Sequence, residues 1–229
     1  MNGIVLQGPT KFFVEVSNFY SQFQNVVFST WETEPKNNLE YIKSKGLNLV
    51  ISEPPKIAGN ININYQLLSS FKGVEFLEKI GCTEIVKIRS DVIFYGVEKI
   101  QNILQGKDIA FLSLNKPYNN DVYFLDYIHP RFDFTTDHII YGKTEILKST
   151  FDFFYFESNS IPAESLILRN YLYKHGYKLD FSKENLKKSK VHIFAEDCLN
   201  AGCSIHWLKR NTDLLGFTFN PNENFITKL

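Results

Sequence analysis

Three charged side chains stand close together in the middle of the chain, within the run KIRSD at residues 87–91. The apolar residues before this run predict a strand over residues 84–88. Because side chains alternate between the two faces of a strand, Lys87 and Arg89 share one face. Unpaired charges are costly to bury inside an α/β sheet, so these two cations need anionic partners.

Two kinds of partner satisfy that need. A bound diphosphate neutralises both cations, and Asp91 then holds a Mg²⁺ or Mn²⁺ ion that bridges it, since such ions bind through one or two carboxylates. Alternatively, the cations form an ordinary ion-pair network with acids of the chain itself. The candidates for that network are Glu75, Glu78 and Glu84.

A polar turn follows the first predicted strand, residues 4–6. It reads Gln7-Gly8-Pro9-Thr10. Gly8 lets the backbone approach a ligand closely, and Thr10 can cap the helix that follows. Helix N-termini attract phosphate. The turn is therefore a candidate phosphate-binding site, although strand-to-helix turns of any α/β protein have a similar composition.

The second predicted strand, residues 26–29, runs into Thr30, Trp31 and Glu32. An indole offers a flat surface for stacking, and a carboxylate accepts hydrogen bonds from a ribose or a base. These residue types suit a nucleoside. The alternative is that Trp31 packs at the edge of the domain and Glu32 begins a solvated loop.

The spacing of the apolar runs predicts an α/β fold with parallel strands. Strands end at residues 6, 29 and 52, so 23 residues separate successive ends. Helical patterns over residues 11–22 and 38–45 fill the intervals, and such crossovers make neighbouring strands parallel. Ligands bind beyond the carboxyl ends of strands in parallel sheets, which is where the polar residues above stand.

The remaining sequence predicts a mixed sheet with further helices. An antiparallel excursion is expected around the turn at residues 116–120, and residues 183–190 form a basic, solvated stretch. The final strand is expected at residues 191–194. Helices are predicted over residues 64–80, 97–104, 144–154 and 163–175, and strands over residues 49–52, 109–114, 122–127 and 138–141.

The chain is predicted to form a single domain. No repeat, low-complexity tract or linker divides its 229 residues. We expect a mixed, mostly parallel sheet flanked by helices, as in Rossmann-like folds. Residues 1–114 hold the candidate phosphate-binding and nucleoside-binding residues and are called the donor half. Residues 115–229 are expected to hold the second substrate and are called the acceptor half.

Charge and cysteine content exclude several classes of function. The 25 basic residues equal the 25 acidic ones, so no overall field attracts nucleic acid or anionic lipid. Cys82, Cys198 and Cys203 match no paired metal spacing, which favours a reducing, cytoplasmic compartment. No leader or spanning segment is expected. The aromatic residues 151–156 can touch a membrane surface, although they also suit the end of a core helix.

The motifs at residues 4–9, 29–32 and 87–91 together resemble the WavE-like lipopolysaccharide-synthesis proteins, which look like GT-A-type glycosyltransferases. The resemblance covers the donor half well and the acceptor half loosely. It implies a nucleoside-diphosphate sugar as the donor, with the base and ribose near the first two motifs and the diphosphate near the third. The donor-binding residues so implied are Gln7, Gly8, Pro9, Thr10, Thr30, Trp31, Glu32, Asn64, Gln66, Lys87, Arg89 and Asp91.

Two positions depart from the pattern of that family. The family favours Arg where this chain has Tyr65, which removes a phosphate contact. Many GT-A enzymes also have an acid where this chain has Arg89, so only Asp91 remains to hold a metal. Metal dependence is therefore open, and Lys87 and Arg89 can neutralise the leaving diphosphate themselves.

An acceptor hydroxyl needs a general base, and two carboxylates, Asp137 and Glu164, are the catalytic candidates, of which Glu164 is preferred. It lies in the first turn of a predicted helix, where Pro162 suits the helix start and the dipole favours the ionised form. The segment from Glu164 to Gly176 looks like the acid-helix-glycine ending of many inverting GT-A enzymes, but a first-turn glutamate also stabilises helices in general. Asp137 and His138, at the entrance of a strand, are candidates for binding acceptor hydroxyls or helping to hold the metal.

Together with these residues, the resemblance implies a glycosyltransferase that moves a sugar from a nucleoside-diphosphate sugar to a hydroxyl of a glycan acceptor, of the surface-polysaccharide or lipopolysaccharide type. One alternative is a sugar nucleotidyltransferase, for which the turn at residues 7–11 is poor in glycine. Another is a nucleotide-sugar or glycan-binding domain that has lost catalysis, which the missing second acid allows.

Overall fold

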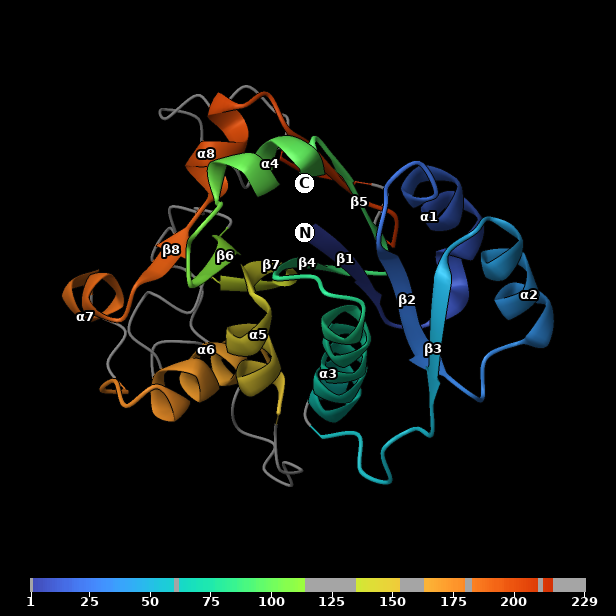
Figure 1. Cartoon of the computed structure of the whole chain (residues 1–229), viewed down its shortest axis with the longest axis horizontal. Coiled ribbons are helices and arrows are strands. Elements are labelled where there is room, and N and C mark those ends of the chain that lie inside the picture. Colours follow the sequence, from blue (N-terminus) through green and yellow to red (C-terminus); the bar gives the residue numbers. More distant parts are fainter. Residues whose placement is uncertain are drawn as a thin grey trace.

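The protein is a three-layer α/β domain in which helices cover both faces of a central sheet (Figure 1). The fold class predicted from the sequence is therefore confirmed. The computed structural model describes residues 2–59, 62–113, 135–152, 163–179, 183–209 and 212–215.

The central sheet has seven strands in the order β3-β2-β1-β4-β7-β6-β8. β7 pairs antiparallel with both of its neighbours, and the other pairs are parallel. The order of the first four strands, 3-2-1-4, is that of the nucleotide-binding part of doubly wound sheets. The strands are β1 (Asn2–Gln7), β2 (Val26–Trp31), β3 (Asn48–Ser52), β4 (Glu84–Arg89), β6 (Ile109–Ser113), β7 (Thr135–Lys143) and β8 (Val191–Ile193).

The apolar run in β1 shows how the sequence produces three layers. Ile4 and Leu6 are buried in the hydrophobic cluster on one face of the sheet, whereas Val5 is buried in the cluster on the other. A strand covered on both faces has no polar side, so its sequence is continuously apolar rather than alternating.

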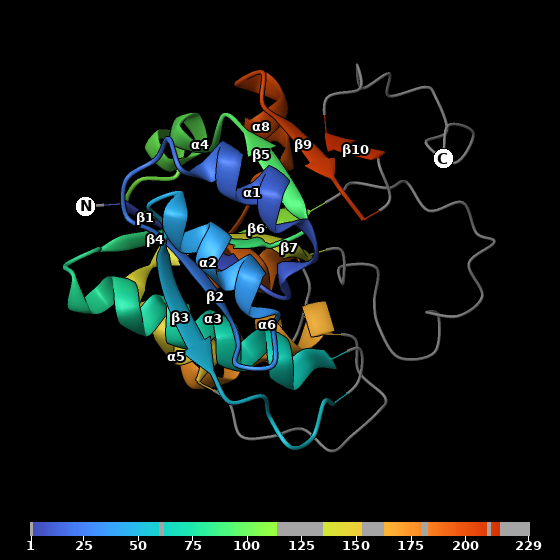
Figure 2. The ribbon, with the colours of Figure 1, turned by 90° about the vertical axis from the view of Figure 1, so that its right-hand side faces the viewer.

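The helices divide between the two faces (Figures 1 and 2). The cluster that contains Val5 is completed by α3, α5 and α6, and the opposite cluster by α1, α2, α4 and α8. The helices are η1 (Thr10–Phe12), α1 (Phe13–Tyr20), α2 (Lys36–Ser44), α3 (Ile63–Lys79), α4 (Val97–Ile103), α5 (Thr144–Phe151), α6 (Ala163–Lys174), α7 (Lys183–Lys188) and α8 (Ala195–Asn200).

A second, smaller sheet was not predicted from the sequence. Its order is β10-β9-β5, from β5 (Val92–Tyr95), β9 (Ser204–Trp207) and β10 (Thr212–Leu215). The Tyr20 hydroxyl fixes β5 on α1, because it donates to the Val92 carbonyl at 3.2 Å and accepts from the Phe94 amide at 3.0 Å. These strands have four residues each, too few for a periodic pattern to distinguish them from loops.

Two further expectations need correction. The strand at residues 191–194 is not the last, because β9 and β10 follow it. The basic stretch at residues 183–190 contains the short helix α7 rather than only solvated loop. The strand predicted at residues 122–127 lies outside the described residues. Within the described part of the chain, no helix is both long and apolar enough to cross a membrane.

Candidate functional site

A cavity of about 700 Å³ opens at the edge of the sheet where β1, β2 and β4 end. Each strand contributes its last residue to the lining, namely Gln7, Trp31 and Arg89. His138 joins them because β7 runs antiparallel to β4, with Ile139 opposite Ile88, so the start of β7 lies beside the end of β4. The cavity is thus at the edge where parallel sheets bind ligands.

The turn after β1 is joined directly to the turn after β4. The Ser90 amide donates to the Gln7 carbonyl at 2.8 Å, and the Ser90 hydroxyl donates to the Pro9 carbonyl at 2.8 Å. Gly8 has φ +133°, and a Cβ there would lie 2.6 Å from the Ser90 hydroxyl. Glycine is therefore required at Gly8 for both its conformation and its lack of a side chain.

Arg89 is held by two carboxylates. Its Nε donates to Asp91 Oδ1 at 3.0 Å and its Nη2 to Asp91 Oδ2 at 2.8 Å, while Nη1 lies 3.3 Å from both oxygens of Asp137. The Asp137 side chain is 1% exposed and that of Arg89 is 22% exposed. Arg89 therefore lies between a buried acid and the cavity, with part of its guanidinium reaching the cavity surface.

Nearby positive charges lower the pKa values of Asp91 and Asp137. Burial alone raises the pKa of Asp137, but the positive charges of Arg89 and Lys87 outweigh it, so the pKa lies below its ordinary value. Burial likewise raises the pKa of Asp91, and the hydrogen bonds and charge of Arg89 reverse the shift. Both acids are thus carboxylates near neutral pH.

Lys87 does not reach the cavity, which corrects the expectation that it grips a ligand. Its side chain is fully buried, and its Nζ donates to the backbone carbonyl of Asp137. The two cations share one face of β4 and have anionic partners, as predicted, but Asp91 and Asp137 provide the charge. Glu75 and Glu78 instead pair with other lysines.

Trp207, at the end of β9, is a site residue that the sequence did not reveal. Its Nε1 donates to Asp91 Oδ2 at 2.9 Å, and its ring lies 5.7 Å from the Arg89 guanidinium carbon. The His138 ring packs edge-on against the indole at 4.7 Å between centroids. No local motif marks Trp207, because it lies 116 residues from Asp91 and on the sheet that was not predicted.

A divalent ion does not fit the residues predicted to hold it. Both oxygens of Asp91 accept hydrogen bonds from Arg89, and one also accepts from Trp207. Across the described residues, no three His, Cys, Asp or Glu side chains are grouped as a metal site requires. Arg89 already neutralises the charge of Asp91, so no step below depends on a metal.

Trp31 and Tyr65 form an aromatic pair in the cavity wall. Their ring centroids are 4.9 Å apart at 80°, and both residues line the cavity together with Gln66. Gln7 lies nearby with its Oε1 buried and, among the described residues, without a hydrogen-bond partner. This part of the lining therefore combines aromatic side chains with a buried amide oxygen that has no hydrogen-bond partner among the described residues.

Several predicted donor-site residues lie behind the lining rather than in it. Thr30 is fully buried and does not border the cavity, and Asn64 donates to the Ile57 carbonyl at 3.0 Å. Glu32 is exposed outside the cavity. Glu34, rather than Glu32, borders the cavity, and it accepts hydrogen bonds from both the amide and the hydroxyl of Thr10.

The candidates for acceptor chemistry have separate positions. Asp137 is too deeply buried, and too firmly paired with Arg89, to accept a proton from a substrate, which corrects its predicted catalytic role. Glu164 lies in the first turn of α6, as predicted, but its side chain falls outside the described residues. Its role as base stays a prediction.

His138 faces the cavity as a neutral, unpaired ring. It is 8% exposed, and within the described structure neither ring nitrogen has a hydrogen-bond partner. Its Nδ1 is 3.7 Å from Asp137 Oδ1, too far for a hydrogen bond. Burial lowers the pKa of His138 to about 4, despite the nearby carboxylates. A neutral imidazole offers one donor and one acceptor to a ligand.

We expect His138 to make the protein less stable as the pH falls from about 6.5 to about 4. Over that range the unfolded chain binds a proton that the folded chain excludes, so the free energy of unfolding falls, by about 3 kcal/mol in total. Urea unfolding of His138→Gln against pH should lack this loss. His175→Gln, at a less buried histidine, should retain most of it. The same slope in His138→Gln and the wild type would contradict this account.

Comparisons with known proteins identify no family. No protein-family model matches the chain, and no curated protein matches its sequence, so the resemblance to WavE-like proteins stays a prediction. One solved structure that aligns with the chain is from Bacillus anthracis and is described as a glucose-1-phosphate thymidylyltransferase in complex with a sucrose. The TM-score is 0.45 at 12% identity, over 82% of this chain and 93% of that chain. A likeness of this degree carries no inference about chemistry.

Proposed function

We propose that the chain binds a nucleoside-diphosphate sugar in this cavity and transfers the sugar to a hydroxyl of a glycan acceptor. The observation that carries the proposal is the meeting of two side-chain groups at the carboxyl edge of a 3-2-1-4 sheet. One is the aromatic pair of Trp31 and Tyr65, and the other is Arg89 with its two carboxylates. Together they suit the two chemically different parts of such a donor.

The aromatic pair and Gln7 suit the nucleoside. A base packs on aromatic rings because both surfaces are flat and apolar, and both residues line the cavity, Trp31 buried and Tyr65 partly exposed. The buried Gln7 Oε1, unpaired among the described residues, accepts a hydrogen bond from an N–H group of a base or from a ribose hydroxyl. Leaving such an acceptor unpaired is costly, so a ligand that satisfies it is favoured.

The charges around the cavity suit a diphosphate. Its lining has three cationic side chains, Lys11, Arg89 and Lys209, against two acidic ones, Glu34 and Asp91. Both lysines are exposed, and within the described residues neither forms an ion pair. The excess of positive charge is therefore local, although the chain as a whole is neutral.

The proposed reaction breaks the bond between the anomeric carbon and the phosphate oxygen, and that oxygen leaves with the bonding electrons. Arg89, Lys11 and Lys209 stabilise the negative charge that develops on the diphosphate, an effect that grows toward the transition state. The acceptor hydroxyl oxygen bonds to the anomeric carbon, and Glu164 takes its proton. His138, as a neutral ring, hydrogen-bonds a sugar or acceptor hydroxyl.

Donor hydrolysis tests the proposal. We expect the protein to release a nucleoside diphosphate slowly from one member of a panel of nucleoside-diphosphate sugars. Asp91→Asn should lower that rate by about 10²-fold, because the Arg89 guanidinium loses a carboxylate that orients it. Asp91→Asn activity equal to the wild type would contradict the assignment. Pyrophosphate release from a nucleoside triphosphate and a sugar phosphate would instead indicate a nucleotidyltransferase, and binding without turnover a catalytically inactive domain.

A further inference from the structure

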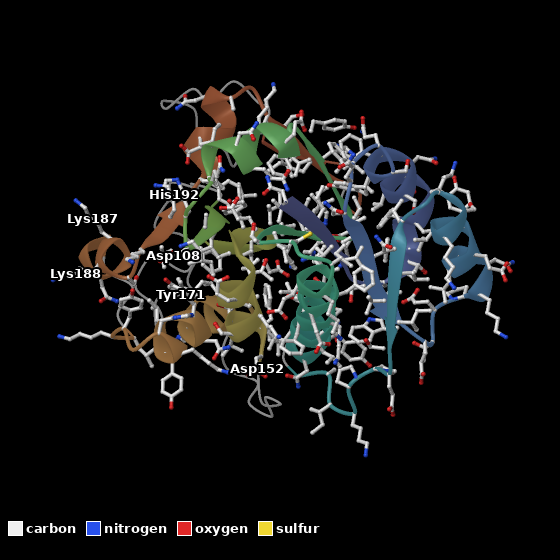
Figure 3. The ribbon with its side chains drawn as sticks, viewed as in Figure 1. Asp108, Asp152, Tyr171, Lys187, Lys188 and His192 are labelled. Carbon is white, nitrogen blue, oxygen red and sulfur yellow. The ribbon has the colours of Figure 1, made fainter. Side chains whose placement is uncertain are left out.

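The most basic part of the chain is residues 173–190, none of which lines the cavity. This segment has six lysines, no arginine and only two acids, whereas the whole chain has as many acidic as basic residues. It covers the end of α6, the connection that follows, and α7, next to the edge strand β8. Figure 3 shows Lys187 and Lys188 pointing away from the rest of the molecule.

Two hydrogen bonds connect the region of α7 to α6 and to the connection that follows α6. The Tyr171 hydroxyl donates to the Ser189 carbonyl at 2.7 Å, and both residues are buried. The Asn185 side chain donates to the Lys178 carbonyl at 2.9 Å. The second of these bonds fixes the backbone of Lys178 beside α7.

The positive charge of this segment is only partly neutralised. Lys174 Nζ lies 3.1 Å from Asp152 Oδ2, and Lys190 Nζ lies 3.5 Å from Asp108 Oδ2. Asp108 also forms an ion pair with Lys143. Lys178 and Lys187, by contrast, form no ion pair within the described residues. The exposed lysines of the segment are Lys174, Lys178, Lys187, Lys188 and Lys190.

Two exposed apolar side chains belong to the same segment of the chain as these lysines. Tyr173 is 73% exposed and Leu179 is 55% exposed, which makes them the two most exposed large hydrophobic residues of the described chain. Each is next to an exposed lysine, Lys174 and Lys178 respectively. Clustered lysines with an aromatic and an aliphatic side chain are typical of surfaces that lie on anionic membranes.

We propose that the surface formed by residues 173–179 and 183–190 docks on an anionic membrane. Lysines attract the negative headgroups, and Tyr173 and Leu179 insert at the boundary between headgroups and acyl chains. The lack of arginine disfavours a nucleic-acid partner, since arginine provides the bidentate contacts typical of such interfaces. The proposal does not depend on the function of the cavity.

Vesicle sedimentation of the full chain tests the proposal without any nucleotide or sugar. We expect the protein to sediment with vesicles that contain phosphatidylglycerol, but not with vesicles of phosphatidylcholine alone, and to be released by salt. Lys178→Gln with Lys187→Gln should weaken partitioning by about 30-fold, since each lysine near an anionic surface contributes about fivefold. Neither lysine forms an ion pair within the described residues, so the fold should be kept.

A matched variant removes the same charge elsewhere. Lys36→Gln with Lys43→Gln changes two exposed lysines of α2, which lies on the opposite side of the molecule from α7 in Figure 1, and should keep full partitioning. The double variant Tyr173→Ser with Leu179→Ser should also weaken partitioning onto the anionic vesicles. Equal sedimentation with neutral vesicles, equal losses in both lysine variants, or binding to nucleic acid but not to vesicles would overturn the proposal.

Discussion

Replacing Arg89 with Gln is expected to lower the free energy of unfolding by about 3–5 kcal/mol, because the substitution leaves a buried carboxylate without its cation. Asp137 is 1% exposed, and Arg89 is the side chain whose charge most lowers its pKa. For a chain of this size we expect a fall in Tm of roughly 6–20 °C. Urea unfolding at neutral pH measures the loss directly.

A double-mutant cycle separates the ion pair from other effects of the substitution. If the cost of Arg89→Gln comes from stranding Asp137, then adding Asp137→Asn should restore part of the stability, because the second change removes the stranded charge. The difference in the free energy of unfolding between Arg89→Gln and the wild type should also become smaller below about pH 4. The depressed pKa of Asp137 means that its contribution is complete above the ordinary pKa and is lost as the pH falls. Additive losses in the cycle would show that the two side chains act independently.

Glu164→Gln is expected to lower kcat by about 10²–10⁴-fold and to leave donor binding unchanged, because the amide cannot take the proton of the acceptor hydroxyl. This expectation rests on the proposed function. Steady-state kinetics with the donor identified by hydrolysis, together with calorimetry of donor binding, measure the two quantities separately.

Glu145→Gln is the matched control for that variant, because Glu145 is also an acid in the first turn of a helix, α5. If the role of Glu164 is only to stabilise its helix, both substitutions should cost a few tenths of a kcal/mol in stability and leave kcat unchanged. A Glu164→Gln enzyme with wild-type kcat would therefore remove Glu164 from the mechanism.

The parallel half of the fold could be predicted because each of its elements has a local pattern. The ends at residues 6, 29 and 52 gave the correct order of strand and helix, since a buried parallel strand is continuously apolar and its crossover helix is amphipathic. The same logic placed Gln7, Trp31 and Arg89 at one edge of the sheet. All three line one cavity in the structure.

The parts that could not be predicted depend on contacts between distant residues. Because side chains alternate along β4, Lys87 and Arg89 share one face of the sheet and need anionic partners. One of these partners, Asp137, belongs to β7 and lies 48 residues from Arg89 in the sequence. Trp207 reaches Asp91 through a second sheet of short strands. In both cases the sequence indicated that a partner was needed without indicating which residue provides it.

Binding of nucleoside diphosphates, measured as a shift in Tm, tests most directly whether the cavity at the strand ends is a nucleotide site. At a ligand concentration of 100 times Kd, one nucleoside diphosphate should raise Tm by roughly 5–11 °C. Lys11→Glu with Lys209→Glu should abolish the shift, and Lys36→Glu with Lys43→Glu, which reverses two exposed lysines outside the cavity lining, should keep it. If no nucleoside diphosphate stabilises the wild type, or if the variant of the cavity lysines keeps the full shift, the cavity is not the nucleotide site proposed above.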